Sequence, residues 1–95
     1  MTVKLSKSTR SGKKWMVEVE GKIIHFGAAG MSDYTIHGDA KRRESYLNRH
    51  RPRENWGRTG RQTAGFWSRW LLWNKKSLRS SIRDIRDRFG IVVKV

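Results

Sequence analysis

Residues 64–75, AGFWSRWLLWNK, hold four large aromatic side chains within eight positions of a chain that is otherwise rich in arginine. Phe66, Trp70 and Trp73 recur at i, i+4 and i+7, which is the spacing of one face of a helix. Trp67 begins a second apolar stripe beside the first. The periodicity therefore predicts a short helix through this stretch, with an unusually wide apolar face.

Three roles are open to these rings: a core, a platform on which nucleic-acid bases stack, or a seat for another protein. We favour the core, because each buried ring removes ~150–250 Å² from water and the chain has few aliphatic residues. A helix this short cannot easily bury two apolar stripes in one small domain. We therefore assign the aromatic side chains that the domain does not bury to contacts between copies of the chain. We therefore expect a homo-oligomer. The residues that we assign to its interface or to the core are Phe66, Trp67, Trp70 and Trp73.

The segments before the aromatic stretch predict a hairpin preceded by an arm. Residues 15–26 alternate apolar and polar side chains, as a half-buried hairpin requires. A two-residue turn at Gly21–Lys22 places Val19 opposite Ile24. Residues 1–14 show little periodicity and many basic groups, and we expect them to form a flexible basic arm.

Further elements follow the hairpin. Asp39 is suited to cap a helix that runs to about His50. After the aromatic stretch, Ser77 can cap another helix, which Gly90 ends, and residues 91–95 read as a strand. These elements predict an α+β fold, with the N-terminal β-hairpin and the C-terminal strand in a small antiparallel sheet packed against two or three helices. Residues 15–95 are expected to form this single domain.

Charge is the strongest signal of function. The chain has 22 Lys and Arg against 8 Asp and Glu, which leaves a net charge of +14. A field of this size attracts polyanions, chiefly nucleic acid. Two segments, 1–14 and 41–61, hold most of the unopposed charge, and we expect them to bind phosphates, although a charge run can also be an ordinary solvated face. The candidate nucleic-acid-binding residues are Lys4, Lys7, Arg10, Lys13, Lys14, Lys41, Arg42, Arg43, Arg49, Arg51, Arg53, Arg58 and Arg61.

Other functions find less support in the sequence. There is no cysteine, no apolar run long enough to span a membrane and no signal for secretion. His50 and Glu54 have i,i+4 spacing, but Pro52 lies between them and no recognised ligand pattern is present, so we expect no metal site, cofactor or catalytic residue. A small metal-dependent nuclease remains a minority interpretation. Its site would be lined by Tyr34, Tyr46, Arg49 and Glu54.

Two long segments resemble a known group of proteins. They are HFGAAGMSDYTIHGDAKRRESYLNRHRPRENW at 25–56 and TAGFWSRWLLWNKKSL at 63–78. Both resemble a family of small basic proteins of unassigned function from large double-stranded DNA viruses, Marseillevirus-like viruses among them. The resemblance implies a viral setting, with the protein in the virion and the infected host cell. It brings no catalytic residues to transfer.

The sequence thus favours a non-enzymatic DNA-binding protein of a large DNA virus. No motif for base-specific readout is evident, so binding should be largely independent of sequence. Oligomers of such a protein would multiply modest phosphate affinities and compact or package the genome. The alternative is a virion scaffold or protein-interaction module whose basic face meets an acidic protein or the inner membrane.

Overall fold

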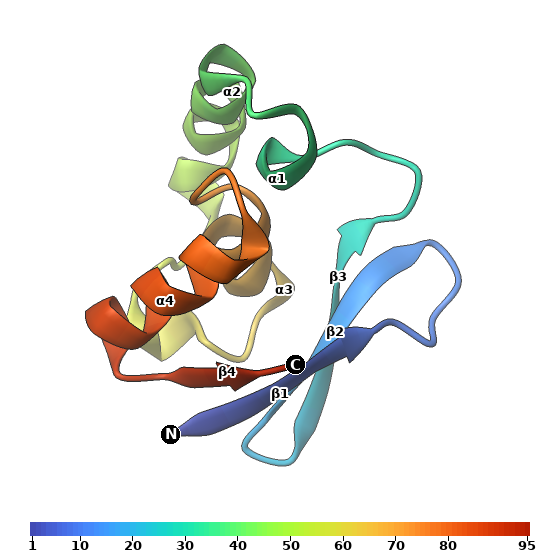
Figure 1. Ribbon diagram of the computed structural model, residues 1–95, viewed down its shortest axis with the longest axis vertical. Helices are drawn as coiled ribbons and strands as arrows, with labels where there is room; N and C mark the ends of the chain where they lie inside the picture. The colour runs from blue at the N-terminus through green and yellow to red at the C-terminus, as the bar shows by residue number, and fades with distance from the viewer.

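The computed structural model describes the whole chain, residues 1–95, as a four-stranded sheet with its helices on one side (Figure 1). The strands are β1 (Thr2–Lys7), β2 (Lys13–Val19), β3 (Lys22–Ala28) and β4 (Val92–Lys94), in the order β3-β2-β1-β4. The α-helices are α1 (Tyr34–His37), α2 (Ala40–His50), α3 (Ala64–Trp67) and α4 (Leu78–Phe89). Shorter helical turns are η1 (Arg51–Arg53), η2 (Arg58–Gly60) and η3 (Ser68–Leu72). The predicted α+β class is confirmed.

The predicted hairpin is present with a different turn. Glu20 and Gly21 form the two-residue turn, both with positive φ (52° and 80°), one residue earlier than predicted. Left-handed conformation at both positions matches the twist of the flanking strands. The predicted register is therefore wrong by two positions, since Ile24 faces Val17 and not Val19. A shift of two leaves every side chain on its predicted face, which is why the alternation still assigns the faces correctly.

The N-terminal residues are not a flexible arm. Thr2–Lys7 forms β1, which lies inside the sheet between β2 and β4. Val3 and Leu5 are each 1% exposed and belong to the core. The predicted boundary between an arm at 1–14 and a separate domain is therefore wrong. Two apolar positions are too few to identify a strand whose second partner lies at the other end of the chain.

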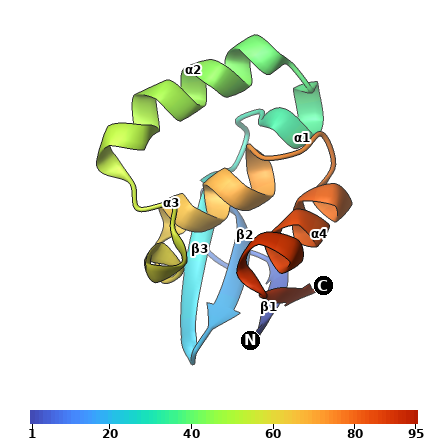
Figure 2. The ribbon, with the colours of Figure 1, turned by 90° about the vertical axis from the view of Figure 1, so that its left-hand side faces the viewer.

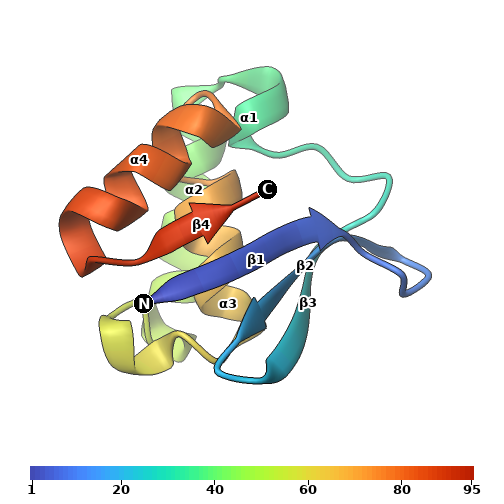
Figure 3. The same cartoon turned by 60° about the horizontal axis from the view of Figure 1, so that its bottom comes forward.

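The C-terminal strand joins the sheet in parallel. β4 pairs with β1, with Val93 opposite Val3, and the two strands run in the same direction (Figure 3). The sheet is thus mixed and not purely antiparallel as predicted. The physical reason is the connection: the chain crosses over the sheet through the helices before returning to its edge, which suits a parallel strand.

The aromatic stretch forms a helix that changes type. Thr63 caps α3, and η3 continues it as a π-helical segment in which the Trp73 N–H donates to the Ser68 carbonyl oxygen at 3.2 Å. One extra residue in the turn rotates the subsequent residues by about 100° relative to an α-helix. Trp73 therefore leaves the stripe that it was predicted to share with Phe66 and Trp70.

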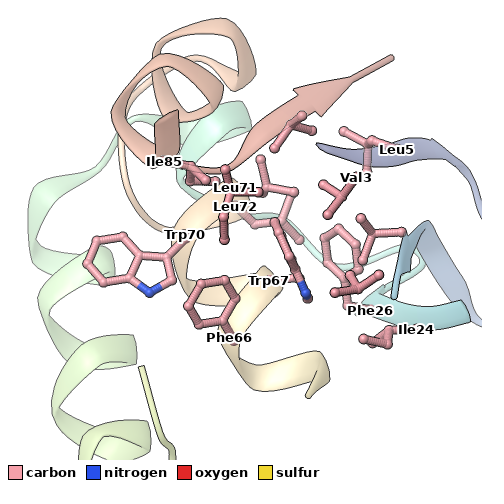
Figure 4. Packing of buried hydrophobic residues seen from close by; sticks show 14 residues of the cluster. Val3, Leu5, Ile24, Phe26, Phe66, Trp67, Trp70, Leu71, Leu72 and Ile85 are labelled. Carbon is pink, nitrogen blue, oxygen red and sulfur yellow. The ribbon is translucent and has the colours of Figure 1, made fainter. Parts of the chain in front are cut away.

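Both predicted stripes are buried within one chain except at Trp73, which is half-buried. Trp67 points toward the strands, whereas Trp70 points to the side where α2 lies (Figure 4). Phe66 and Trp70 both pack against Phe89 of α4, with ring centroids 5.2 Å apart in each pair. The expectation that a short helix cannot bury two stripes is wrong, because α3 and η3 are covered on several sides.

The remaining helices surround this segment. Figure 2 shows α3 between α2 and the strands, with α4 at the side. Asp39 caps α2 and Ser77 caps α4, as predicted, and Gly90 ends α4 in the left-handed conformation. Of α2, only Tyr46 and Leu47 are buried, so most of this helix faces outward. None of the helices has the length and apolar character needed to cross a membrane.

Candidate nucleic-acid interface

A cleft of about 370 Å³ opens where α2, the end of β3 and the start of α3 meet. α2 and the residues just after it supply polar lining, the start of β2 supplies basic lining, and β3 with α3 supplies mostly apolar lining. The ionisable lining residues are Lys13, Lys14, Asp33, Tyr46, Arg49, His50 and Glu54. The cleft therefore combines an apolar surface with charged groups of both signs.

Two glycines give this cleft its shape. A Cβ on Gly65 would collide with the carboxylate of Glu54, so the glutamate side chain lies directly over the backbone of α3. Gly27 has a φ of 78°, and a Cβ there would lie 2.8 Å from Cδ1 of Leu72. Only glycine adopts that φ without strain. Both positions thus allow side chains of α3, η3 and the α2 region to approach the backbone closely.

Three aromatic rings that line the cleft stack in a column. The Tyr46 and Trp73 ring centroids are 4.3 Å apart with planes 3° from parallel, and the Tyr46 and His50 centroids are 4.2 Å apart at 26°. Burial raises the pKa of Tyr46, and the hydroxyl lies 3.2 Å from Oγ of Ser68. Tyr46 is therefore neutral near pH 7. His50 ends the column, with 34% of its side chain exposed.

His50 also approaches Glu54. The helix α2 ends at His50, as Pro52 predicts, but the chain continues directly into η1 and keeps the two side chains on the same side. Nδ1 of His50 lies 3.7 Å from Oε1 of Glu54. The proline does not separate the pair as the sequence suggested, because a 3₁₀ turn accepts proline in its first turn.

An ion pair fixes the loop between β3 and α1. Nζ of Lys14 donates to Oδ2 of Asp33 at 2.6 Å, and Asp33 is 3% exposed. The same carboxylate caps α1 by accepting from the Thr35 N–H at 2.9 Å. Lys14 and Asp33 thus neutralise one another and hold the loop against β2. Lys14 is consequently less available to a phosphate than a free surface lysine.

The cleft continues along α2 into a second hollow of about 380 Å³. The two hollows share Met31, Ser32, Arg49 and Trp73, and we call them together the α2 groove. Lys41 and Arg42, from the first turn of α2, line the second hollow. The basic residues of the whole α2 groove are Lys13, Lys14, Lys41, Arg42 and Arg49, and its acidic residues are Asp33 and Glu54.

The structure separates the predicted basic residues into groups. Five of them line the α2 groove: Lys13, Lys14, Lys41, Arg42 and Arg49. Arg51 and Arg53 are exposed in η1, which follows α2 directly. The three that lie in β1 and the turn after it do not line the groove: Lys4, Lys7 and Arg10. The sequence grouped all of these by position in the chain, whereas the fold brings only Lys13 and Lys14 of the first segment to α2.

Three predicted phosphate-binding arginines instead hold the fold together. Nε of Arg43 donates to the carbonyl oxygens of Trp73 and Asn74 at 3.0 and 3.1 Å. Arg58 donates to the carbonyl of Phe89. Arg61 forks onto Glu20, with donor–acceptor distances of 2.9 and 3.2 Å, and these hydrogen bonds with that from Gln62 lower the pKa of the Glu20 carboxyl. At least one guanidinium donor of each of these arginines already has an acceptor within the chain.

Arg69 is held in the same way. Its guanidinium carbon lies 5.3 Å from the ring centroid of Trp56 and 4.2 Å from that of Trp70, and it donates to the Trp73 carbonyl at 3.2 Å. Burial, and after it the charge of Arg43, lower the pKa of Arg69 to about 10. The side chain remains charged at neutral pH and is packed between rings, where it supports η3.

A second basic surface was not identified from the sequence. Arg79, Arg83 and Arg86 of α4 line a hollow of about 260 Å³ beside Val92 and Val93. No acidic residue lines this hollow. We call these three residues the α4 arginine face. Their spacing at i, i+4 and i+7 places them on one face of a helix and could have identified this surface. Asp84 and Asp87 lie next to these arginines in the sequence and partly offset their charge, which hid it.

The three histidines lie apart from one another. Nδ1 of His25 is 2.7 Å from Oγ of Ser8, and Nδ1 of His37 accepts from the Asp39 N–H at 2.8 Å. Only His50 lines the cleft. No group of three or more His, Asp or Glu side chains is placed to hold a metal ion.

The chain belongs to the family of unknown function DUF5754, whose model matches residues 3–50. The match runs from β1 to the end of α2, so it includes both strands of the hairpin and the helix that forms the groove. No curated protein and no solved structure matches the chain.

Proposed function

We propose that this member of the DUF5754 family binds double-stranded DNA, largely independently of sequence, and that the α2 groove is its main contact surface. The observation that supports the proposal is the charge imbalance of the groove. Its two carboxylates already face partners, Asp33 with Lys14 and Glu54 with His50. Four basic side chains remain without an acidic partner in the groove: Lys13, Lys41, Arg42 and Arg49.

The placement of these cations suits a nucleic-acid backbone. Lys41, Arg42 and Arg49 lie along the length of α2 and are exposed. Arg51 and Arg53 extend the positive surface beyond the end of the helix. Contacts with phosphates position a protein on DNA but carry no base information, so binding would depend steeply on salt and little on sequence.

The α4 arginine face offers a second contact. Its hollow shares no lining residue with the α2 groove, so one chain presents two basic surfaces. A protein with two such surfaces can bridge two duplex segments, and joining two modest contacts increases the overall affinity. Compaction of a genome by this route does not require an oligomer.

Self-association stays a prediction, and its basis has changed. Of the four rings that suggested it, Phe66, Trp67 and Trp70 lie in the core of the single chain, and Trp73 is half-buried and stacks on Tyr46. Large apolar side chains that do reach the surface include Ile23, Met31, Ile36 and Val92. A viral setting, a place in the virion, a packaging role and the lack of enzymatic activity likewise stay predictions.

The test is a salt titration with two matched variants. Affinity for a random-sequence duplex is measured by fluorescence anisotropy between ~50 and 200 mM salt, where several phosphate contacts would cost orders of magnitude in affinity. Lys41→Gln with Arg49→Gln removes two charges from the α2 groove. Lys4→Gln with Lys94→Gln removes two from exposed positions in β1 and β4. We expect the first variant to reduce the salt slope by about 2, at ~0.9 per phosphate contact, and the second to leave it nearly unchanged.

Three outcomes would contradict the proposal. Equal effects of the two variants would mean that net charge, and not the α2 groove, attracts the DNA. No binding at low salt would exclude DNA as the partner. Binding of polyglutamate with the affinity of DNA would favour the scaffold or protein-interaction role, since a carboxylate polymer matches the charge of DNA but has no phosphates.

A further inference from the structure

We propose that the cleft within the α2 groove receives one unpaired nucleotide of the bound DNA, with its base in the cleft and its phosphate on the basic rim. This inference rests on the proposed function, because the duplex must first be held along α2. It adds a preference for DNA that contains an unpaired base, which phosphate contacts alone do not provide.

The dimensions of the cleft suit a single small group. Its volume of about 370 Å³ lies at the lower end of the ~300–1,000 Å³ typical of small-molecule sites. A duplex cannot enter a space of that size, but one base can. Gly27 and Gly65 let Leu72 and Glu54 pack directly against the backbone beside the cleft, since a Cβ at either position would collide with those side chains.

The aromatic column supplies a stacking surface. Trp73 and Tyr46 hold each other in parallel, and His50 continues the stack to the exposed end. Every base has a flat face that stacks on such rings, and proteins that bind unpaired nucleotides use this contact widely. Tyr46 holds the ring of His50 through stacking and Glu54 faces its Nδ1, so the ring is ordered before a base arrives.

Polar groups around the column match the rest of a nucleotide. Lys13 and Arg49 line the same cleft and face no acidic partner there, which places positive charge beside a base that has entered. The carboxylate of Glu54, 25% exposed, can accept hydrogen bonds from the amino or imino groups of a base. The cleft thus offers apolar surface for a base together with charged groups for its polar atoms, unlike a surface that only contacts backbone.

A base in a paired duplex is not available to this cleft. Extruding it costs the stacking and pairing energy of that base, and the cost is smallest where the base is already unpaired. The protein should therefore bind a duplex with a one-nucleotide bulge more tightly than the fully paired duplex. The gain requires the base itself and not the flexibility of the bulged backbone.

The experiment compares three duplexes of equal length and sequence: fully paired, with a one-nucleotide bulge, and with an abasic bulge. Anisotropy at one salt concentration should show about 5- to 150-fold tighter binding to the bulge, the range for one stacked base, and no such gain for the abasic bulge. His50→Ala should lose most of the gain, expressed as the ratio of its affinities for the bulged and the paired duplex, because freeing the Glu54 carboxylate also changes the affinity for paired DNA. The matched control is His25→Ala, whose ring lies on β3 beside Ser8, and it should keep that ratio.

Ala64→Phe provides a second test, because Ala64 is an exposed residue of the cleft lining and the larger side chain fills the space without removing a core contact. It should abolish the preference as His50→Ala does. Equal binding of wild type to all three duplexes would overturn this inference and leave the proposed function intact. Equal gains for the abasic and the normal bulge would overturn it too. Failure to bind any of the duplexes would instead defeat the proposed function.

Discussion

The two sides of the α3–η3 segment use aromatic side chains differently. Toward the sheet, Trp67 is fully buried and its Nε1 donates to the Arg61 carbonyl at 2.6 Å. Toward α2, Trp73 is half-buried and stacks on Tyr46, in a column that ends at the partly exposed His50. The two sides differ in how completely they are covered. On the α2 side, Tyr46 and Leu47 are the only side chains of the helix that are buried. The same residue type thus forms the core on one side and the lining of a cleft on the other.

The largest expected effect comes from the sheet side. Trp67→Ala should lower the free energy of unfolding by about 3–5 kcal/mol, because the cavity forms where neighbours cannot move in. For a chain of this length the total is only about 5–14 kcal/mol, so the variant should be close to unfolding at room temperature. Urea denaturation followed by circular dichroism measures this. An unfolding midpoint equal to that of wild type would show that Trp67 is not a core residue.

Gly65→Ala tests the contact between Glu54 and α3. Helix propensity alone predicts that alanine stabilises this position, since glycine costs ~1 kcal/mol in a helix. The collision of its Cβ with the Glu54 carboxylate predicts the opposite sign, a loss of about 1–3 kcal/mol from overpacking. Gly65→Ala combined with Glu54→Ala should recover most of that loss. A stabilised single variant would mean that Glu54 does not lie over the helix.

The column side should be less sensitive. Trp73→Leu keeps an apolar side chain of moderate size and removes the stack on Tyr46, so we expect a loss of about 0.5–1.5 kcal/mol. The same urea series gives the value. A loss as large as that of Trp67→Ala would remove the distinction between the core side and the cleft side.

The smallest expected effect concerns Asp84 of α4, which belongs neither to the sheet side nor to the α2 side of the α3–η3 segment. Partial burial raises its pKa, but hydrogen bonds from Asn74 and Arg88 outweigh it and lower the pKa below the ordinary 3.8. A carboxyl with a lowered folded pKa contributes stability above pH 3.8 that is lost as the pH falls through the folded value. Asp84→Asn should therefore be less stable than wild type near pH 6, by under about 1 kcal/mol for a solvent-screened pair. The difference in stability between the variant and wild type should shrink as the pH falls below 3.8, which acid unfolding curves measure. A difference that grows in acid would contradict the lowered pKa of Asp84.

Local signals predicted the local elements. Asp39, Ser77 and Gly90 mark helix ends in the sequence and in the structure, because capping depends on neighbours within a turn. The alternation of residues 15–26 revealed the hairpin for the same reason. The strand at Thr2–Lys7 was missed because its position depends on β4, at the far end of the chain.

The site was only partly predictable. The basic character of α2 is evident from composition, but the internal role of Arg43, Arg58 and Arg61 is not, since their carbonyl and carboxylate acceptors lie 30 or more positions away or in another element. The π-helical turn of η3 has no sequence signal that we could use, and it is this turn that directs Trp73 toward Tyr46. The cleft could not be inferred from the sequence, because neither the internal contacts of the arginines nor the π-helical turn of η3 can be read from it.

The most direct test of the central claim is a two-dimensional amide NMR titration of the protein with duplex DNA. We predict that the shifts of Lys41, Arg42 and Arg49 and of the loop at 29–33 change most, that α4 residues 79–86 change at higher DNA concentration, and that β1 and β2 residues 2–6 and 16–18 stay unchanged. This pattern would place DNA along the α2 groove. Changes centred on the open face of the sheet, or no changes at all, would contradict the account.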